Sequence, residues 1–437
     1  MRSRRFRRVR FHLCGTLVRI GAAVVTSSAA YAADPAASTF SFAGFGTAGV
    51  VHSSERNADF VGSVAQPNGA GYTHRWSADV DSKLGVQMFA TAMDRFSAAV
   101  QVVSEHRYDN TYTPDIEWAY AKYHVTPALD VRIGRTVDTL YLQSDLRLVG
   151  YTYPWVRRPR EIYGLIPINN KDGIDATYQF RFGEVTNSVQ ASYGRTDFKL
   201  PDGRSVRERG IFTLNNTIEY GPATVRVAYT ALRADLNNPG IDGFFSSLEQ
   251  FGDMLSAGGL QPYGNQAIAL VDKYRFVKRR YSVVTVGASY DPGNWLLMAE
   301  WARTPVSPAL FPPSTAWYVA GGYRFGRFTP YVTLARLAAH RPSPESGIST
   351  AGLPAALVPT AAAYNAGISS IVDGFRFTQK TVSAGVRWDF TKNAALKLQY
   401  DRLTTGADSP GMLGNVQPGF QPGSKIHLIS AALDFVF

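Results

Sequence analysis

Apolar and polar residues alternate with a period of two along most of this chain. In the segment 172–182 every second residue is apolar: Ile174, Ala176, Tyr178, Phe180 and Phe182. The residues between them are polar: Asp175, Thr177, Gln179 and Arg181. On a β-strand two such sets face opposite sides of the sheet. The alternation therefore predicts strands with one apolar and one polar face, and an all-β fold.

Sixteen segments of the chain are predicted strands. They lie near 39–51, 80–93, 95–107, 116–125, 128–136, 172–182, 184–195, 211–220, 222–234, 278–290, 293–303, 314–325, 327–339, 376–390, 393–403 and 424–437. Most are longer than the usual strand of about 5–6 residues. A tilted strand needs about 9–11 residues to cross a bilayer. The predicted strands are therefore long enough to span a membrane, and a hairpin hidden in a long loop would raise their number to eighteen.

Short and long connections alternate strictly between these strands. Short turns fall around Asp94, Thr126-Pro127, Gly183, Gly221-Pro222, Asp291-Pro292-Gly293, Gly326 and Thr391-Lys392. Long loops cover about 52–79, 108–115, 137–171, 196–210, 235–277, 304–313, 340–375 and 404–423. Barrels of the bacterial outer membrane have this asymmetry, with short periplasmic turns and long extracellular loops. The pattern predicts a transmembrane antiparallel β-barrel of about sixteen strands.

The number of half-apolar strands also favours a membrane barrel over a soluble sandwich. Two packed sheets bury their apolar faces in one shared core. Sixteen strands are too many for one such core of ordinary size. A membrane barrel turns the apolar faces to lipid and the polar faces to its lumen, and its closure leaves no unpaired edge in hydrocarbon.

The N-terminal 32 residues have the pattern of a secretory signal peptide. Residues 1–10 carry six arginines and no acid, a short apolar stretch follows, and Ala30-Tyr31-Ala32 is a small-residue cleavage pattern. Seven of the 45 basic residues precede the predicted cut, so 38 remain against 34 acids and the net charge falls from +11 to +4. The one cysteine, Cys14, is also in this leader. Residues 33–437 are therefore expected to form a single barrel domain without disulfides and without a nucleic-acid partner.

The C-terminal segment is a predicted amphipathic strand that ends in phenylalanine. Phe437 and Phe435 share one face with Leu433, and Asp434 lies on the other face. A last strand of this kind resembles the assembly signal of outer-membrane barrels. Tyr220, Tyr290, Trp295 and Trp388 are among the aromatic residues near strand ends, where barrels carry interfacial girdles.

Several short motifs resemble those of Gram-negative porins. They are Asp81-Ser82-Lys83-Leu84-Gly85, Ile116-Glu117-Trp118-Ala119-Tyr120, Val131-Arg132-Ile133-Gly134-Arg135, and the run from Tyr141-Leu142-Gln143-Ser144-Asp145 through Tyr153-Pro154-Trp155 to Glu161-Ile162-Tyr163. The last run resembles a proteobacterial porin-like subgroup. The resemblance implies a barrel integral to the outer membrane, in contact with lipid and lipopolysaccharide, usually a homotrimer, that conducts ions and small hydrophilic solutes without a cofactor. The acidic Pro-Glu-Phe-Gly-Gly-like motif of the enteric members is not found in the third long loop.

In the resembled family the third long loop, about 137–171 here, folds into the lumen and narrows it. The predicted constriction and selectivity residues are Arg132, Arg135, Asp138, Asp145, Arg147, Arg157, Arg158, Arg160 and Glu161. The predicted cations of the lumen wall, assigned by alternation, are Arg107, Arg181, Arg226, Arg324, Arg387 and Lys397. Opposed acids and arginines across a narrow waist set ion preference. Each of these charges has the alternative role of a solvated wall residue or a structural ion pair.

Four kinds of function are compatible with these patterns. A passive diffusion channel is the first hypothesis, and a substrate-selective channel for anions, sugars or carboxylates is the second. An adhesin or receptor acting through loops 235–277 and 340–375 is the third. A soluble secreted binding protein with an all-β fold is the fourth. An enzyme is not expected, because the histidines are scattered and form neither a metal-binding pair nor part of a nucleophile motif.

Overall fold

A computed structural model describes residues 39–93, 95–166, 169–340 and 346–437 of the protein. The predicted signal peptide, residues 1–32, lies outside the described residues. None of the helices in the described residues is long and apolar enough to cross a membrane.

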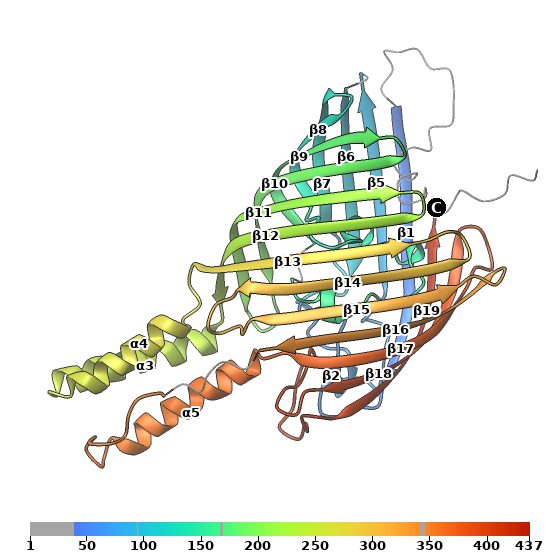
Figure 1. The fold of residues 1–437 in the computed structure, drawn as a ribbon. Helices are drawn as coiled ribbons and strands as arrows, with labels where there is room; N and C mark the ends of the chain where they lie inside the picture. The colour runs from blue at the N-terminus through green and yellow to red at the C-terminus, as the bar shows by residue number, and fades with distance from the viewer. Residues whose placement is uncertain (1–38, 94, 167–168, 341–345) are drawn as a thin grey trace, which may run out of the picture.

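Sixteen long antiparallel strands form one closed barrel among the described residues (Figure 1). They are β1 (Thr39–Ser53), β5 (Lys83–Ala92), β6 (Phe96–Glu105), β7 (Asp115–Thr126), β8 (Leu129–Val137), β9 (Asn170–Phe182), β10 (Val185–Lys199), β11 (Ser205–Tyr220), β12 (Ala223–Asn237), β13 (Arg279–Tyr290), β14 (Trp295–Val306), β15 (Ser314–Tyr323), β16 (Phe328–Ala339), β17 (Thr378–Trp388), β18 (Ala394–Thr405) and β19 (Lys425–Val436). Each strand pairs with its neighbour in the chain, β1 pairs with β5, and β1 with β19 completes the ring. The predicted barrel and all sixteen predicted strands are confirmed.

The short and long connections alternate around the ring as predicted. Gly183, Gly221 and Gly326 close three of the short turns with φ of +55°, +54° and +59°. A residue with a Cβ is strained at such angles, so glycine suits these tight hairpins. The short turns thereby gather at one end of the barrel and the long loops at the other.

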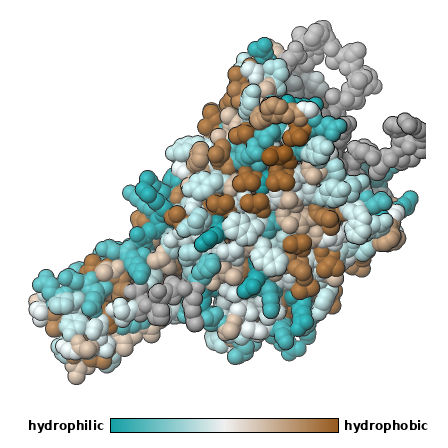
Figure 2. All heavy atoms as spheres, viewed as in Figure 1, coloured by the Kyte–Doolittle hydropathy of each residue, from teal (hydrophilic) through white to brown (hydrophobic). Residues whose placement is uncertain are grey.

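The polarity of the wall is inverted relative to a soluble protein. On β9, Ile174 and Tyr178 are 47% and 49% exposed on the outer face, whereas Asp175 is 2% exposed on the inner face. Figure 2 shows apolar side chains gathered over the outside of the barrel. Tyr290 and Trp295, beside a short turn, are also exposed on the outer surface. These faces are those that the alternation predicts for a wall between lipid and a polar lumen.

The barrel closes where the C-terminal strand meets the first strand. Phe437 N donates to Gly44 O at 3.0 Å, and Gly44 N donates to Phe437 O at 2.8 Å. The Phe437 and Phe435 rings lie over Gly44 and Gly46, where a Cβ would come within 2.1 and 2.4 Å of them. The two terminal phenylalanines therefore form part of the closing seam.

Two of the long loops contain helices of several turns, which the strand pattern does not predict. They are α3 (Pro239–Ala257) and α4 (Gln261–Tyr274) between β12 and β13, and α5 (Val358–Gly374) between β16 and β17. The helices extend from the long-loop end of the barrel (Figure 1) and share an apolar core that includes Phe245, Leu248, Leu270 and Ile368. A helical period of 3.6 confined to a single loop is hidden when the chain is read for a period of two. Among their described residues these two loops add no strand to the barrel wall, which has sixteen long strands.

The first and last long loops pair with each other at the long-loop end. Asp59 and Gly414 exchange two backbone hydrogen bonds of 2.9 Å. Asp59 belongs to the short strand β2 (Asp59–Phe60), which pairs with β3 (Ala70–Gly71). The short strand β4 (Trp76–Ser77) pairs with the end of β1. The Phe60 ring packs with Leu413 and Phe420 and reaches the interior of the barrel, where it borders the third long loop.

Candidate functional site

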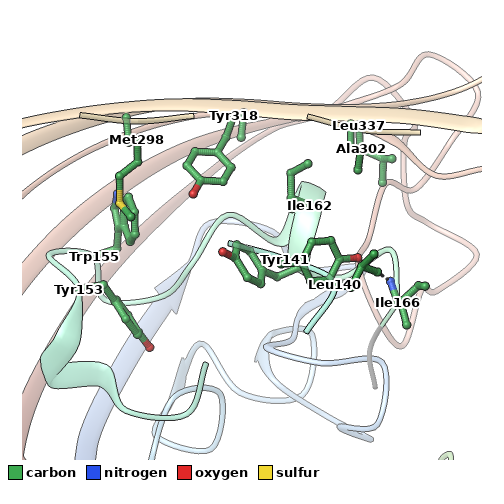
Figure 3. Close-up of a cluster of buried hydrophobic side chains, with 14 of the residues drawn as sticks. Leu140, Tyr141, Tyr153, Trp155, Ile162, Ile166, Met298, Ala302, Tyr318 and Leu337 are labelled. Carbon is green, nitrogen blue, oxygen red and sulfur yellow. Dashed lines mark hydrogen bonds between the residues drawn. The ribbon is translucent and has the colours of Figure 1, made fainter. Parts of the chain in front are cut away.

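The described residues of the third long loop, 138–166 and 169 (L3), lie inside the barrel. L3 is built from the 3-10 turns η1 (Ser144–Leu146) and η2 (Gly150–Thr152) and the one-turn helix α2 (Arg160–Tyr163). Its apolar side chains pack on the inner wall of β12–β16 in one buried cluster, shown in Figure 3. Trp155 and Ile162, 1% and 0% exposed, meet wall residues such as Tyr318. L3 therefore fills this half of the lumen.

A buried ion pair on the wall also holds L3. Lys397 Nζ lies 2.7 Å from Asp434 Oδ2, and both side chains are fully buried. The same ammonium donates to the carbonyl oxygens of Gly150, at 2.7 Å, and Trp155, at 2.8 Å. Asp434 Oδ1 accepts a hydrogen bond of 2.5 Å from Thr47. Lys397, a predicted lumen cation, thus binds the L3 backbone.

Two more of the predicted wall cations bind carbonyl groups of L3. Arg387 Nη1 donates to Tyr151 O at 2.5 Å and to Tyr153 O at 3.1 Å. Arg226 Nη1 donates to Tyr141 O at 2.8 Å and lies 3.7 Å from Asp145. These two guanidinium groups therefore help to hold L3 in position.

The remaining three predicted wall cations lie elsewhere. Arg107 follows the end of β6 and forms a 3.2 Å ion pair with Asp115 at the long-loop end. Arg181 is exposed near the short-turn end of β9. Arg324 follows the end of β15 and binds Asp291 of a short turn through two hydrogen bonds, of 2.6 and 2.7 Å. Arg181 and Arg324 therefore lie at the barrel end opposite the long loops.

Charged residues of L3 itself are paired with the wall at three places. Arg157 binds Asp81 through two hydrogen bonds of 2.9 and 2.6 Å and Asp401 through one of 3.1 Å. Glu161 accepts from Gln379 at 2.8 Å and from Thr381 at 2.5 Å. At the start of the loop, Asp138 pairs with Lys171 of β9 at 2.7 Å.

Glu300 on β14 is a contact of L3 that the sequence analysis does not single out. Its carboxylate accepts from Leu142 N at 2.9 Å, from Tyr318 Oη at 2.8 Å and from the Tyr163 hydroxyl. The carboxylate is buried, and three donors satisfy its oxygens. Alternation places Glu300 on the inner face, but only the fold brings it to Leu142 and Tyr163.

The space left beside L3 is a cavity of about 430 Å³ on the side bordered by β1 and β5–β8, which we call the open side. Charged groups of both signs line it: Asp81, Lys83, Glu105, Arg107, Asp115, Glu117, Arg135, Arg147, Arg157, Arg158, Arg160, Asp197 and Lys199. Residues 62–66 of the first long loop also line the cavity. The cavity is therefore polar, highly charged and bounded by a loop fixed to the opposite wall.

The other predicted constriction residues occupy distinct positions around this cavity. Arg132 points inward and pairs with the buried Asp175 at 2.9 Å. Arg135 shares the strand face of the exposed Ile133, pairs with Asp172 at 2.7 Å, and borders the cavity only at its edge. Arg147 lines the cavity and donates to Tyr163 O at 3.1 Å.

Arg158 and Arg160 line the cavity from L3 and are 6% and 8% exposed. Arg158 Nε donates to Gln143 Oε1 at 3.2 Å, and its Nη2 donates to the Leu146 carbonyl. Arg160 Nε and Nη1 are buried and have no hydrogen-bond partner among the described residues. The structure thus brings all four predicted L3 arginines, Arg147, Arg157, Arg158 and Arg160, to this cavity.

Lys83, Glu105 and Glu117 line the open side but are not among the predicted site residues. Lys83 Nζ lies 3.7 Å from Glu105. All three lie on predicted strands or at their ends, so the alternation contains a signal for their inward direction. The alternation contains no signal for their nearness to L3, because L3 lies further along the chain, after β8.

We expect Gly150→Ala to displace L3, because a Cβ there would lie 2.1 Å from Asp434 Oδ1 and 2.7 Å from Thr47 Oγ1. Both atoms are held in a buried polar network and cannot move freely. Overpacking of this kind costs about 1–3 kcal/mol. Urea unfolding of the detergent-solubilised protein measures the loss. Gly243→Ala, on α3 with nothing within 4 Å of the added Cβ, is the control and should leave stability unchanged or slightly raised.

Comparison with known proteins gives structural neighbours only. No family model and no curated protein sequence matches the chain. The outer-membrane channel DcaP of Acinetobacter baumannii superposes with a TM-score of 0.54 at 12% identity, over 92% of this chain and 99% of that one. OmpF of Salmonella typhi gives 0.51 at 12% identity, over 91% and 97%. A loop L8 deletion mutant of OmpT, an outer membrane protein of Vibrio cholerae, gives 0.51 at 13% identity, over 92% and 100%.

The fold is that of the outer-membrane porins. The match covers nearly the whole of each chain, so it describes one porin-like barrel rather than a shared fragment. At 12–13% identity it establishes the architecture of this porin-like barrel and not its solute.

Proposed function

We propose that this porin-like barrel is a passive diffusion channel for ions and small hydrophilic solutes across the bacterial outer membrane. The observation that carries the proposal is the position of L3. The loop is fixed to the wall of β12–β18 by an apolar cluster and by buried ion pairs, and a charged cavity remains on the open side. A loop held this firmly narrows the lumen without filling it.

The charges of the open side support passage of polar solutes. Arg147, Arg158 and Arg160 come from L3, while Glu105 and Glu117 come from the opposite wall. Opposed charges across a narrow passage orient polar solutes and disfavour apolar ones. Arg132, Arg135, Asp138, Asp145, Arg157 and Glu161 complete our proposed constriction as residues that hold its walls in place.

The outer surface supports insertion in a lipid bilayer as an integral, multi-pass barrel. Its exposed apolar residues would contact lipid chains, and lipopolysaccharide would contact the long-loop end. We propose that the protein is a homotrimer, as the resemblance to porins implies, and that it acts as a channel rather than as an enzyme.

The test is planar-bilayer recording of the purified, detergent-extracted protein, with the reversal potential measured in a KCl gradient. Stepwise conductance, with steps in groups of three, would support a trimeric channel. Absence of steps from protein shown to be folded and inserted would reject the proposal. Passage of one class of solute, with exclusion of other hydrophilic solutes of the same size, would favour the substrate-selective channel over general diffusion.

The helices α3, α4 and α5 are expected to be dispensable for conductance. They extend from the long-loop end and have their own apolar core, apart from the cavity lining. Replacing residues 239–274 and 346–374 by short Gly/Ser linkers should leave the single-channel conductance within about twofold, because loops of this kind tolerate changes in length.

A large fall in conductance after this deletion would show that the helices shape the passage. Loss of cell or phage binding with unchanged conductance would instead favour an additional receptor role for these loops.

A further inference from the structure

Arg158 and Arg160 differ from the other cations of L3 in their partners. Arg157 is held by two carboxylates, Asp81 and Asp401. Within the described residues neither Arg158 nor Arg160 forms a salt bridge with a carboxylate. The acceptors of Arg158 are neutral oxygens of Gln143 and Leu146. Two guanidinium groups thus lie at one cavity with positive charge that no carboxylate contact offsets.

Arg160 carries the strongest sign of a missing partner. It is 8% exposed, and in the part of the chain that the structure describes neither Nε nor Nη1 has a hydrogen-bond acceptor. Burial lowers the pKa of Arg160 to about 10, and attraction to the neighbouring Glu161 only partly opposes this shift. Glu161 itself turns to Gln379 and Thr381. A buried donor without an acceptor is costly, so these atoms would gain from an acceptor supplied by a solute.

Both guanidinium groups lie over the faces of aromatic rings. Arg158 Cζ lies 4.4 Å from the centre of the Tyr153 ring and 5.2 Å from that of Tyr163. Arg160 Cζ lies 5.3 Å from the centre of the Phe60 ring. Contact with a ring face restrains a guanidinium group and leaves N–H groups as donors. Planar donors of fixed direction suit the paired oxygens of a carboxylate or phosphate.

Three acids of the same cavity are engaged with other cations. Glu105 lies 3.7 Å from Lys83, Asp115 lies 3.2 Å from Arg107, and Asp197 lies 2.8 Å from Arg209. None of these contacts reaches the two arginines of L3. An anion at Arg158 and Arg160 would therefore not have to displace a carboxylate already bound there.

We propose that Arg158 and Arg160 form a binding site for a small oxyanion, the carboxylate or phosphate group of a solute in the channel. The proposal rests on the proposed function and adds to it the class of solute that the passage retains. Oxygen atoms of the anion accept hydrogen bonds from the guanidinium groups of Arg158 and Arg160, which both line the cavity. A retained anion occupies the passage, so the ion current falls with anion concentration and reaches a limit.

The test uses the full-length protein in planar bilayers with KCl, to which succinate and inorganic phosphate are added in separate titrations. In the wild type we expect a saturable fall in current with each anion. Arg160→Gln and Arg158→Gln should each raise the half-blocking concentration about tenfold, because each removes charge-assisted hydrogen bonds. Arg204→Gln is the matched control, since it removes one positive charge from an exposed turn pair with Asp202 and should leave the half-blocking concentration unchanged.

Arg160→Lys keeps the charge and removes the planar donors, so it should give a smaller rise than Arg160→Gln. It also provides a second reading of the site if the glutamine variant does not assemble. Wild-type channels that show no saturable block, or arginine variants that match Arg204→Gln, would overturn the site and leave the channel intact. A response to phosphate alone would restrict the site to phosphate groups, and one to succinate alone would restrict it to carboxylates. Absence of conductance steps before any anion is added would reject the channel itself.

Discussion

Lys397→Met should loosen L3 and lower the free energy of unfolding by about 3–5 kcal/mol, because it leaves the buried Asp434 carboxylate without its cation. It also removes the donor to the carbonyl oxygens of Gly150 and Trp155. Urea unfolding in detergent measures the stability. Single-channel recording should show noisier currents, since L3 would be free to leave the wall and move into the open side.

The double variant Lys397→Met/Asp434→Leu is the informative control. It removes both buried charges, so part of the lost stability should return, although the two carbonyl oxygens still lack a donor. A double variant no more stable than Lys397→Met would show that the carbonyl contacts, rather than the ion pair, hold the loop. Wild-type stability and current in Lys397→Met would contradict the role of this pair.

Trp155→Ala should have an effect of similar size through a different interaction. The indole is 1% exposed and packs within the cluster of L3 and the wall. Truncation of a buried tryptophan to alanine costs about 3–5 kcal/mol. The vacated volume lies between L3 and β15–β16, so the loop should move towards that wall and the open side should widen. We expect a rise in single-channel conductance and faster passage of larger sugars in liposome swelling.

Thr333→Val separates packing from hydrogen bonding in that prediction. Trp155 Nε1 donates to Thr333 Oγ1 at 2.8 Å, and valine removes this acceptor while keeping the shape of the side chain. It should cost only about 1–3 kcal/mol, the penalty for an unsatisfied buried donor. A Trp155→Ala variant with no more effect than Thr333→Val would show that the apolar cluster does not hold L3.

The architecture of the barrel is readable from the sequence because it depends on local rules. The period of two assigns each residue of β9 to a face, and the structure confirms both sets on that strand. Turn glycines such as Gly183 and Gly221 mark the short hairpins. Neighbours in the chain are also neighbours in the sheet, so the order of strands follows directly.

The helices of the long loops show where this local reading stops. Phe245 and Leu248 of α3 are buried against residues such as Ile368, which lies on α5 in another loop. The apolar periodicity of each helix extends over one segment only. The helices are stabilised by packing between loops that are far apart in the chain. The alternation of apolar and polar residues along a strand does not indicate such contacts between distant loops.

The sequence by itself determined the number of strands, their inner and outer faces, and the alternation of short and long connections, because each follows from residues close together in the chain. Only the tertiary structure decided which charges of the lumen are engaged. Lys397 and Gly150 are 247 residues apart, yet one hydrogen bond joins them, whereas Arg160 has two donors without an acceptor. Alternation gives the direction of a side chain but not its partner, and an ionic partner depends on how a loop packs across a closed barrel.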